Sequence, residues 1–285
     1  MRIGFVGAGL MGAGMVRQLA GAGHMVRLYA RTASKAAGLP AELVSTITAA
    51  VEGMDLACSC VTDSADVEQV VEAILRADNP PPVLVELSTI APSVARELAA
   101  SCEARGVNYL DCPVSGGPEG AASGTLAIMC GGDARSLAVA APALDVMGDP
   151  AKRVHFGPVG SGLVAKLVNN MLVASITAAT VEALGVGQRE GLDPAVLREA
   201  VLAATGASWQ LQYRIPNALA GNFAAGFTTD NLRKDLGHAA ALTPGPTPFL
   251  ELSRHLYDDV DGSLDFVALA RHFMDLPAST ERDST

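Results

Sequence analysis

Hydrophobic residues fall mainly in short runs through the first half of the chain and at helical spacing through the second half. The short runs lie at residues 2–6, 25–29, 55–61, 83–87, 106–110 and 124–132. Runs of this length predict strands buried on both faces, and the helical patterns between most of them predict a parallel sheet. This alternation is typical of a doubly wound α/β fold.

Downstream of residue 157 the alternation stops and the pattern becomes helical throughout. Helices are predicted at 163–189, 194–204, 208–219, 230–242 and 246–257. A sheet-forming half followed by an all-helical half predicts two domains, which we place at residues 1–161 and 162–285, the second opening with a long helix. Residues 278–285 are polar and are expected to be disordered.

The first apolar run leads directly into a glycine-rich turn, which is followed by a helical pattern to about residue 20. The turn consists of Gly7, Ala8, Gly9, Leu10, Met11 and Gly12. A strand, G-x-G-x-x-G and a helix in this order predict a Rossmann dinucleotide-binding domain. The first glycine permits a tight turn, the second lets the backbone approach a pyrophosphate, and the third allows close packing of helix and strand. The alternative is a glycine-rich turn without a ligand.

The end of the second predicted strand bears on which dinucleotide binds. NAD sites usually carry Asp or Glu there, to hydrogen-bond the ribose 2′-hydroxyl. This chain has Arg31 and Thr32, and Arg31 could pair with a 2′-phosphate, so we expect NADP, with NAD as the alternative. Later strand ends should also face the cofactor, and these carry Val61, Thr62 and Thr89. For Thr89 the alternative is plain capping of the next helix.

One lysine lies inside the longest apolar stretch of the chain. Gly162, Lys166 and Asn170 are four residues apart, so a helix places them on one face, where the glycine leaves room for a neighbour. A buried cation needs a functional reason, and burial would lower the pKa of its amine toward neutrality, as acid–base catalysis requires. Lys166 is therefore a candidate general acid/base, with Asn170 to orient it. The alternative is a lysine that snorkels from the helix.

A second glycine-rich segment follows the strand at 106–110. It contains Ser115, Gly116 and Gly117, which expose a hydroxyl group and several backbone amides. A concave loop of this kind suits a small carboxylate. The alternative is a glycine-rich hairpin turn.

Composition and charge exclude several classes of function. The net charge is −10 and no Lys/Arg cluster interrupts it, which argues against a nucleic-acid partner. Residues 163–187 are apolar and long enough for a membrane span, but the polar residues among them favour a buried helix, so we expect no membrane partner.

Five cysteines without a C-x-x-C pair, in a chain that begins as a strand, indicate reduced thiols and a cytoplasmic protein. The histidines lack metal-ligand spacing, so no metal is expected.

Four motifs together resemble the β-hydroxyacid dehydrogenase family, which includes 3-hydroxyisobutyrate dehydrogenases and glyoxylate/succinic semialdehyde reductases. The motifs are the turn at 7–12, residues 111–117 followed by Gly124-Thr-Leu, Gly160-Ser-Gly162 with Lys166 and Asn170, and Lys234-Asp235-Leu236. The likeness extends from residue 2 to about residue 275. It implies an active site between the domains and a homodimer or homotetramer.

The resemblance also implies roles for individual residues. The reaction would be reversible hydride transfer between a nicotinamide and a small β-hydroxy acid or its aldehyde, with Lys166 as the catalytic lysine. The substrate-anchoring positions of the family match Ser115, Gly116, Gly117, Asn170 and Asp235. Lys234 matches a lysine near the nicotinamide, and Arg31-Thr32 matches a pair seen in NADP-preferring members.

Several positions depart from the family pattern. Glu86 stands where aspartate is common, Ala30 where NADP-dependent members often have asparagine, and His238 where an apolar residue is usual. An exposed or packed side chain is preferred for His238, and a core or interface role for Trp209, to a place in the substrate pocket. Two other functions stay open: an imine reductase-like enzyme, which typically lacks the lysine, and a non-catalytic NADP-binding regulatory module.

Overall fold

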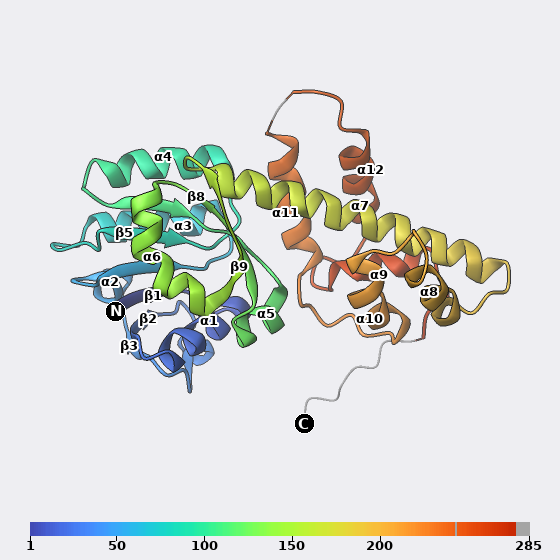
Figure 1. The fold of residues 1–285 in the computed structure, drawn as a ribbon, viewed down its shortest axis with the longest axis horizontal. Helices are drawn as coiled ribbons and strands as arrows, with labels where there is room; N and C mark the ends of the chain where they lie inside the picture. Colours follow the sequence, from blue (N-terminus) through green and yellow to red (C-terminus); the bar gives the residue numbers. More distant parts are fainter. Residues whose placement is uncertain (243, 278–285) are drawn as a thin grey trace. The chain divides into compact units, whose positions relative to one another are not determined.

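The structure is a computed structural model that describes residues 1–242 and 244–277. The predicted disordered tail, 278–285, lies outside the described residues. The chain divides into two compact units between Lys166 and Leu167. Each unit is described separately below, and Figure 1 gives the element labels.

The first unit is built on a nine-stranded sheet in the order β3-β2-β1-β4-β5-β6-β8-β7, with β9 paired to β8. The strands are β1 (Arg2–Val6), β2 (Met25–Tyr29), β3 (Glu42–Val44), β4 (Leu56–Ser59), β5 (Val83–Glu86), β6 (Asn108–Asp111), β7 (Val114–Ser115), β8 (Leu126–Gly131) and β9 (Gly148–Gly157). Strands β1 to β6 pair in parallel in the order 3-2-1-4-5-6, which is the order of a doubly wound dinucleotide-binding sheet. The Rossmann prediction is therefore confirmed.

Helices connect these strands, as the sequence predicted for most of the crossovers. They are α1 (Leu10–Gly21), the 3₁₀ helix η1 (Ala33–Ala36), α2 (Ile47–Val51), α3 (Ser64–Leu75), α4 (Pro92–Glu103), α5 (Gly117–Ser123) and α6 (Ala134–Met147). Beyond β6 the pairing changes, because β8 runs antiparallel to both β6 and β7. The antiparallel end brings residues 111–117 and 126–131 together.

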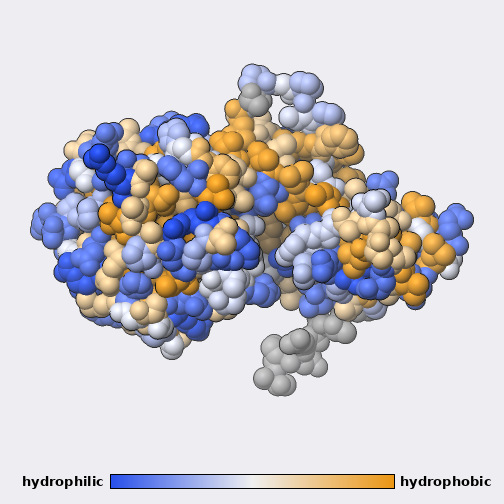
Figure 2. Space-filling view, viewed as in Figure 1, coloured by the Kyte–Doolittle hydropathy of each residue, from blue (hydrophilic) through white to orange (hydrophobic). Residues whose placement is uncertain are grey.

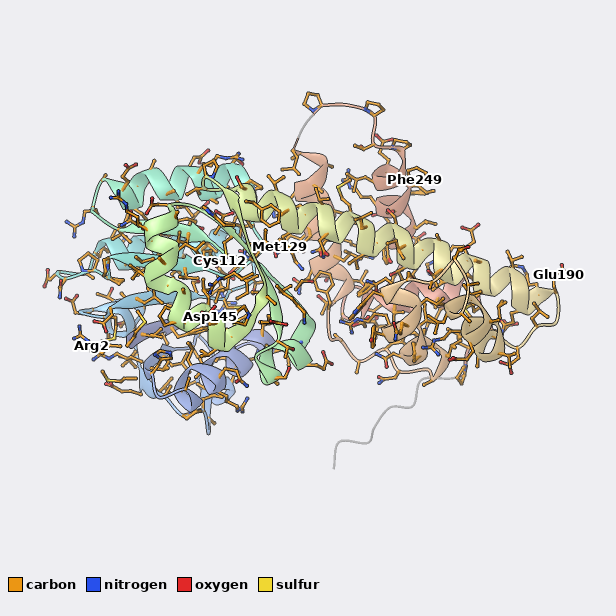
Figure 3. All side chains as sticks on the ribbon, viewed as in Figure 1. Arg2, Cys112, Met129, Asp145, Glu190 and Phe249 are labelled. Atoms are coloured by element: carbon orange, nitrogen blue, oxygen red, sulfur yellow. The ribbon has the colours of Figure 1, made fainter. Side chains whose placement is uncertain are left out.

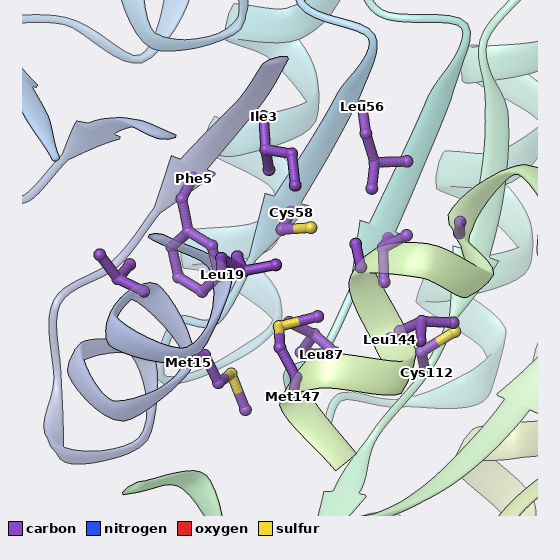
Figure 4. Packing of buried hydrophobic residues seen from close by; sticks show 14 of the residues in the cluster. Ile3, Phe5, Met15, Leu19, Leu56, Cys58, Leu87, Cys112, Leu144 and Met147 are labelled. Atoms are coloured by element: carbon purple, nitrogen blue, oxygen red, sulfur yellow. The ribbon is translucent and has the colours of Figure 1, made fainter. Parts of the chain in front are cut away.

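The sheet is covered on both faces, which explains the unbroken apolar runs. Ile3 and Phe5 belong to one hydrophobic cluster with Met15 and Leu19 of α1 (Figure 4). Val6 belongs to a second cluster, built on α2, α3 and α4. Because successive side chains of a strand point to opposite faces, the two clusters lie on the two sides of the sheet. Strands β4 and β5 are buried at every position.

The second unit is helical. After most of α7 (Ser161–Arg189) it contains α8 (Pro194–Leu202), α9 (Trp209–Tyr213), α10 (Ile215–Leu219), α11 (Thr229–Ala240), α12 (Pro248–Asp258) and the 3₁₀ helix η2 (Phe266–His272). The single helix predicted at 208–219 is two helices that meet at Arg214. The break precedes Pro216, which is compatible with the first turn of a helix and incompatible with its interior.

Helix α7 is long and apolar enough to cross a membrane by length and composition alone. Its buried side, however, carries Lys166 and Asn170 as well as apolar residues. Beyond Lys166, α7 contributes Leu167, Ala174 and Val181 to the core of the helical unit, where they contact residues of α9 to α12. The apolar character of α7 is therefore explained by its packing in the core of the helical unit.

Candidate active site

The glycine turn after β1 has the geometry that a dinucleotide requires. Gly7 has a φ of +107°, and a Cβ there would collide with the carbonyl oxygen of Cys60, which follows β4. A Cβ on Gly12 would collide with the carbonyl oxygen of Gly7, whereas a Cβ on Gly9 would meet nothing within 4 Å. Gly7 and Gly12 therefore pack the start of α1 against the sheet, and Gly9 faces open space. Among the described residues no side chain caps α1, so its first amides suit a phosphate.

The end of β2 presents Arg31 at the surface, next to the first turn of α3. The Arg31 Nη1 atom donates to Asp66 Oδ1 at 2.8 Å, and the Arg31 side chain is 74% exposed. Thr32 directly precedes η1. The sequence pointed to Arg31 but not to Asp66, because the two are 35 residues apart and no local pattern connects them.

The ends of β4 and β5 are tied together beside the glycine turn. The Val61 backbone amide donates to Ser88 Oγ at 2.8 Å, so the segments that carry Thr62 and Thr89 lie at the same edge of the sheet. Helix α4 has Ala91 as its N-cap. The alternative that Thr89 merely caps the following helix is therefore wrong.

Glu86 ends β5 and is fully buried at this edge. One of its carboxyl oxygens accepts a hydrogen bond from the Ser88 backbone amide at 2.8 Å. Burial raises the pKa of Glu86 to about 7, because the apolar surroundings disfavour its charged form, and its hydrogen bonds offset only part of that effect. The sequence marked Glu86 as a departure from the family but assigned it no function.

Ser115 and its two glycines connect β7 to α5. Gly116 and Gly117 have φ values of +140° and +67°, and Gly117 is the first residue of α5. Ser115 lies opposite Ala127 in the β7–β8 ladder. Since a helix separates the two paired strands, the alternative of a simple hairpin turn is wrong. The predicted carboxylate-binding role of this loop stays a prediction.

Asp111 anchors the first turn of α7 to the sheet. Its Oδ1 accepts from the Gly160 amide at 2.8 Å and its Oδ2 from the Leu163 amide at 2.9 Å, all three groups being buried. Burial raises the pKa of Asp111, and these two amides counteract the shift by stabilising the carboxylate. Asp111 is the first residue of the motif at 111–117. Its contacts with the start of α7 could not be inferred from the sequence, because the partners are about 50 residues away.

Gly162 brings the same turn into backbone contact with the sheet. A Cβ there would collide with the Met129 carbonyl oxygen. It would also lie 2.7 Å from the backbone carbonyl oxygen of Asp111 and 2.9 Å from the backbone nitrogen of Gly131. Figure 3 labels Met129, which lies within β8, and Cys112, which directly follows β6. The inference that Gly162 leaves room for a neighbour is confirmed, and the neighbour is the backbone of β6 and β8.

Lys166 follows Gly162 by one helical turn and is 8% exposed. This low exposure argues against a lysine that snorkels into solvent. The preceding helical turn is held by Asp111 and by the sheet backbone that Gly162 touches, and both belong to the first unit. Lys166 is thus a buried amine on a rigidly anchored turn.

In the helical unit, Asn170 contacts Asp235 of α11, which also pairs with Lys234. Asn170 Nδ2 donates to Asp235 Oδ2 at 2.7 Å, and Lys234 Nζ lies 3.5 Å from Asp235 Oδ1. Asn170 and Asp235 are each 2% exposed. The structure therefore brings together three of the predicted site residues, Asn170, Lys234 and Asp235. Asn170 and Asp235 are 65 positions apart in the sequence.

The two side chains left open by the sequence lie in different surroundings. His238 is half-buried on α11, one turn after Lys234. Trp209 is 56% exposed, with its ring 5.0 Å from that of Tyr213 between centroids. A core role for Trp209 is therefore wrong. In the described residues, no group of three or more His, Cys, Asp or Glu side chains could hold a metal ion.

Family models match nearly the whole chain. Residues 2–158 match the NAD binding domain of 6-phosphogluconate dehydrogenase, and residues 160–273 match the NAD-binding domain of NADP-dependent 3-hydroxyisobutyrate dehydrogenase. Two relatives from Pseudomonas aeruginosa are each 37% identical: an NAD-dependent L-serine dehydrogenase over 272 residues and a 3-hydroxyisobutyrate dehydrogenase over 271 residues. The alignments cover 90% of this chain in both cases, and 91% and 90% of the relatives.

Solved structures agree with these matches. A Mycobacterium tuberculosis 3-hydroxyisobutyrate dehydrogenase with L-serine superposes with a TM-score of 0.86 at 34% identity, covering 95% of this chain and 99% of that one. Psf3 in complex with NADP+ and 2-OPP gives a TM-score of 0.87 at 26% identity, with 95% and 99% covered. An imine reductase from Myxococcus stipitatus, at 20% identity, a TM-score of 0.62 and 95% and 98% coverage, shares the fold alone. The chain thus belongs to the β-hydroxyacid dehydrogenase family, whose members bind a nicotinamide dinucleotide.

Proposed function

We propose that the protein is an NADP-preferring dehydrogenase that interconverts a small β-hydroxy acid and its semialdehyde, with Lys166 as the general acid/base. One observation carries the proposal: a buried lysine lies on a helical turn that Asp111 and Gly162 anchor to the dinucleotide-binding sheet. A general acid/base must be held at a defined position, and burying an amine costs free energy, which favours a functional reason for it.

In this proposal the side chains divide the chemistry between them. The nicotinamide, when bound, supplies the centre that accepts or donates hydride. Lys166 accepts the proton of the substrate hydroxyl in oxidation and returns a proton to the carbonyl oxygen in reduction. Ser115 and the Gly116–Gly117 amides bind the substrate carboxylate and orient the reacting carbon. Asn170, whose side chain Asp235 holds by a 2.7 Å hydrogen bond, hydrogen-bonds a substrate hydroxyl.

The test of Lys166 is the turnover of Lys166→Ala with NADPH and a panel of small semialdehydes. General acid–base catalysis contributes about 10²- to 10⁴-fold, so kcat should fall by that factor while cofactor binding and the melting temperature are retained. Lys152→Ala is a matched control, because Lys152 is an exposed lysine paired with Asp149. Turnover of Lys166→Ala close to that of the control would refute the assignment.

The same panel separates the other two functions. A cyclic imine included among the substrates would be reduced faster than every semialdehyde if the protein were an imine reductase. A regulatory module would bind NADPH and oxidise it with none of the substrates. The buried lysine and the intact Ser115–Gly117 loop support the dehydrogenase.

The preference for NADP is supported by Arg31. It lies at the end of β2, where NAD-specific sites carry an acid that binds the ribose 2′-hydroxyl. A guanidinium at this position can form a bidentate pair with a 2′-phosphate. Arg31→Ala should therefore raise the KM for NADPH and leave that for NADH nearly unchanged. An equal effect on both dinucleotides would contradict this assignment.

We also infer that the protein forms a homodimer or homotetramer through the exposed side of α7. Apolar residues recur there every third or fourth position, as Val168, Leu172, Ile176, Ala179, Ala183 and Val186. Helix α12 lies alongside, because Ser175 Oγ is 3.0 Å from Ser253 Oγ. Figure 2 shows hydrophobic residues gathered in this part of the helical unit. Contiguous apolar patches of this kind mark protein interfaces.

The oligomer can be tested by light scattering after size-exclusion chromatography. The wild-type protein should have two or four times the mass of the chain, and Leu172→Lys should shift it toward the monomer. Val196→Lys is the control, because Val196 is also an exposed apolar residue but lies on α8. A monomeric wild-type protein would contradict the inference.

A further inference from the structure

The ion pair at the end of β2 bears on how strongly the protein distinguishes NADP(H) from NAD(H). Arg31 Nη1 lies 2.8 Å from Asp66 Oδ1. We propose that Asp66 is a specificity-determining residue, which weakens the preference for NADP(H) by competing for Arg31 and by repelling the 2′-phosphate. This inference rests on the proposed function, in which Arg31 binds that phosphate.

The strand order places Asp66 beside the cofactor site. In the sheet, β1 lies between β2 and β4. Arg31 follows β2, and Asp66 lies in the first turn of α3, the helix after β4. Their ion pair therefore spans the carboxyl end of β1, where the glycine turn begins. In this fold the ribose of the dinucleotide lies at the end of β2, so a phosphate that reaches Arg31 must also come close to Asp66.

Asp66 is held in place and largely buried, whereas the Arg31 side chain is mostly exposed to solvent. The Asp66 backbone amide donates to Asp63 Oδ1 at 3.0 Å, and the Asp66 side chain is only 17% exposed. Arg31 is a long side chain exposed over three-quarters of its surface. A bound phosphate would consequently reorient Arg31 and leave the Asp66 carboxylate where it is.

Two effects of the carboxylate act in the same direction. It engages one donor of Arg31 that a phosphate would otherwise use, and an exposed ion pair of this kind changes an equilibrium by a factor of about 1.5 to 5. It also repels a phosphate that carries close to two negative charges. NAD carries a hydroxyl group in place of that phosphate, and a carboxylate can accept its hydrogen bond. Asp66 therefore favours NAD(H) over NADP(H), which opposes the preference for NADP(H) that Arg31 creates.

The experiment compares kcat/KM for NADPH with kcat/KM for NADH in the full-length enzyme. Asp66→Asn should raise the NADPH/NADH ratio about three- to tenfold, mainly through a lower KM for NADPH, and the increase should shrink at high salt. Glu72→Gln is the matched control, because Glu72 also lies on α3 and forms an exposed ion pair, with Arg76. The control should leave the ratio unchanged.

A second variant distinguishes this inference from the proposed function. If Arg31→Ala leaves the ratio unchanged, Arg31 does not bind the phosphate and the NADP assignment fails. If Arg31→Ala lowers the ratio but Asp66→Asn leaves it unchanged or lowers it, the NADP assignment stands and the role of Asp66 is refuted. If Asp66→Asn and Glu72→Gln raise the ratio equally, the effect is one of net charge and the proposal is likewise overturned.

Discussion

Replacing Gly162 by alanine tests whether the anchored turn of α7 positions Lys166. The added Cβ would lie 2.7 Å from the Asp111 carbonyl oxygen and 2.9 Å from the Gly131 nitrogen, and closer still to the Met129 carbonyl oxygen. These are backbone atoms of β6 and β8 or of their ends, which cannot rotate away as a side chain could. Restoring an ordinary contact of 3.4 Å to the Asp111 oxygen alone requires a shift of 0.7 Å (3.4 minus 2.7).

The size of the effect follows from what that shift breaks. The hydrogen bonds from Gly160 and Leu163 to Asp111 measure 2.8 and 2.9 Å, so a shift of this size brings both to the limit of a hydrogen bond. Overpacking costs about 1–3 kcal/mol, and hydrogen bonds to a charged group contribute about 1.5–3 kcal/mol each. The gain in helix propensity from Gly to Ala returns at most about 1 kcal/mol. We expect a net loss of at least about 3 kcal/mol in the free energy of unfolding.

Activity should fall further than stability alone explains. A displacement near 1 Å of a catalytic group can cost about 100-fold in rate, so kcat should drop by about that factor under conditions where the variant is still folded. Urea unfolding and NADPH oxidation are the two assays. Gly21→Ala is the control, since a Cβ on Gly21, the last residue of α1, meets nothing within 4 Å. If the two alanine variants have the same stability and turnover, the turn does not anchor Lys166.

Two further predictions concern other buried groups. The fold raises the pKa of Glu86 from 4.5 to about 7, so it favours the protonated acid, and the free energy of unfolding should fall by about 3 kcal/mol as the pH rises from 4.5 through 7. Urea titrations across this range should show a smaller fall for Glu86→Gln, and an unchanged slope would contradict the assignment. Gly7→Ala should abolish NADPH binding in a calorimetric titration, because Gly7 has a φ of +107° and its Cβ would collide with the Cys60 carbonyl oxygen. Retained binding would show that the turn can rearrange.

The strands that could be predicted are those that are buried on both faces. Strands β4 and β5 consist entirely of buried residues, so each appears as an apolar run. Strand β9 cannot be predicted in this way, because most of its residues are exposed and several are charged, which leaves no apolar run. The sequence of α5 favours a loop, because it contains two glycines and a proline, although proline is well tolerated in the first turn of a helix.

The residues of the candidate site also fall into two groups. Some can be predicted from local spacing, and others depend on contacts between residues far apart in the sequence. Spacing along one helix was enough to place Gly162, Lys166 and Asn170 on one face. No such rule connects Asp111 to the amide of Leu163, 52 residues later, or Arg31 to Asp66. Both carboxylates gain their function only when the sheet brings strand ends together.

The anchoring of the helical turn before Lys166 therefore supports a catalytic role for this lysine more strongly than its spacing in the sequence does. A lysine in an apolar run can snorkel, and its spacing from glycine and asparagine does not exclude that. The structure adds a physical constraint, because Asp111 satisfies two amides at the start of α7 and Gly162 allows that turn to touch the sheet backbone. A helix held in this way one turn before a buried amine fixes the amine to the unit that carries the glycine turn. Lys166, the proposed proton-transfer group, and the dinucleotide turn thus belong to one unit, as the proposed coupling of hydride and proton transfer requires.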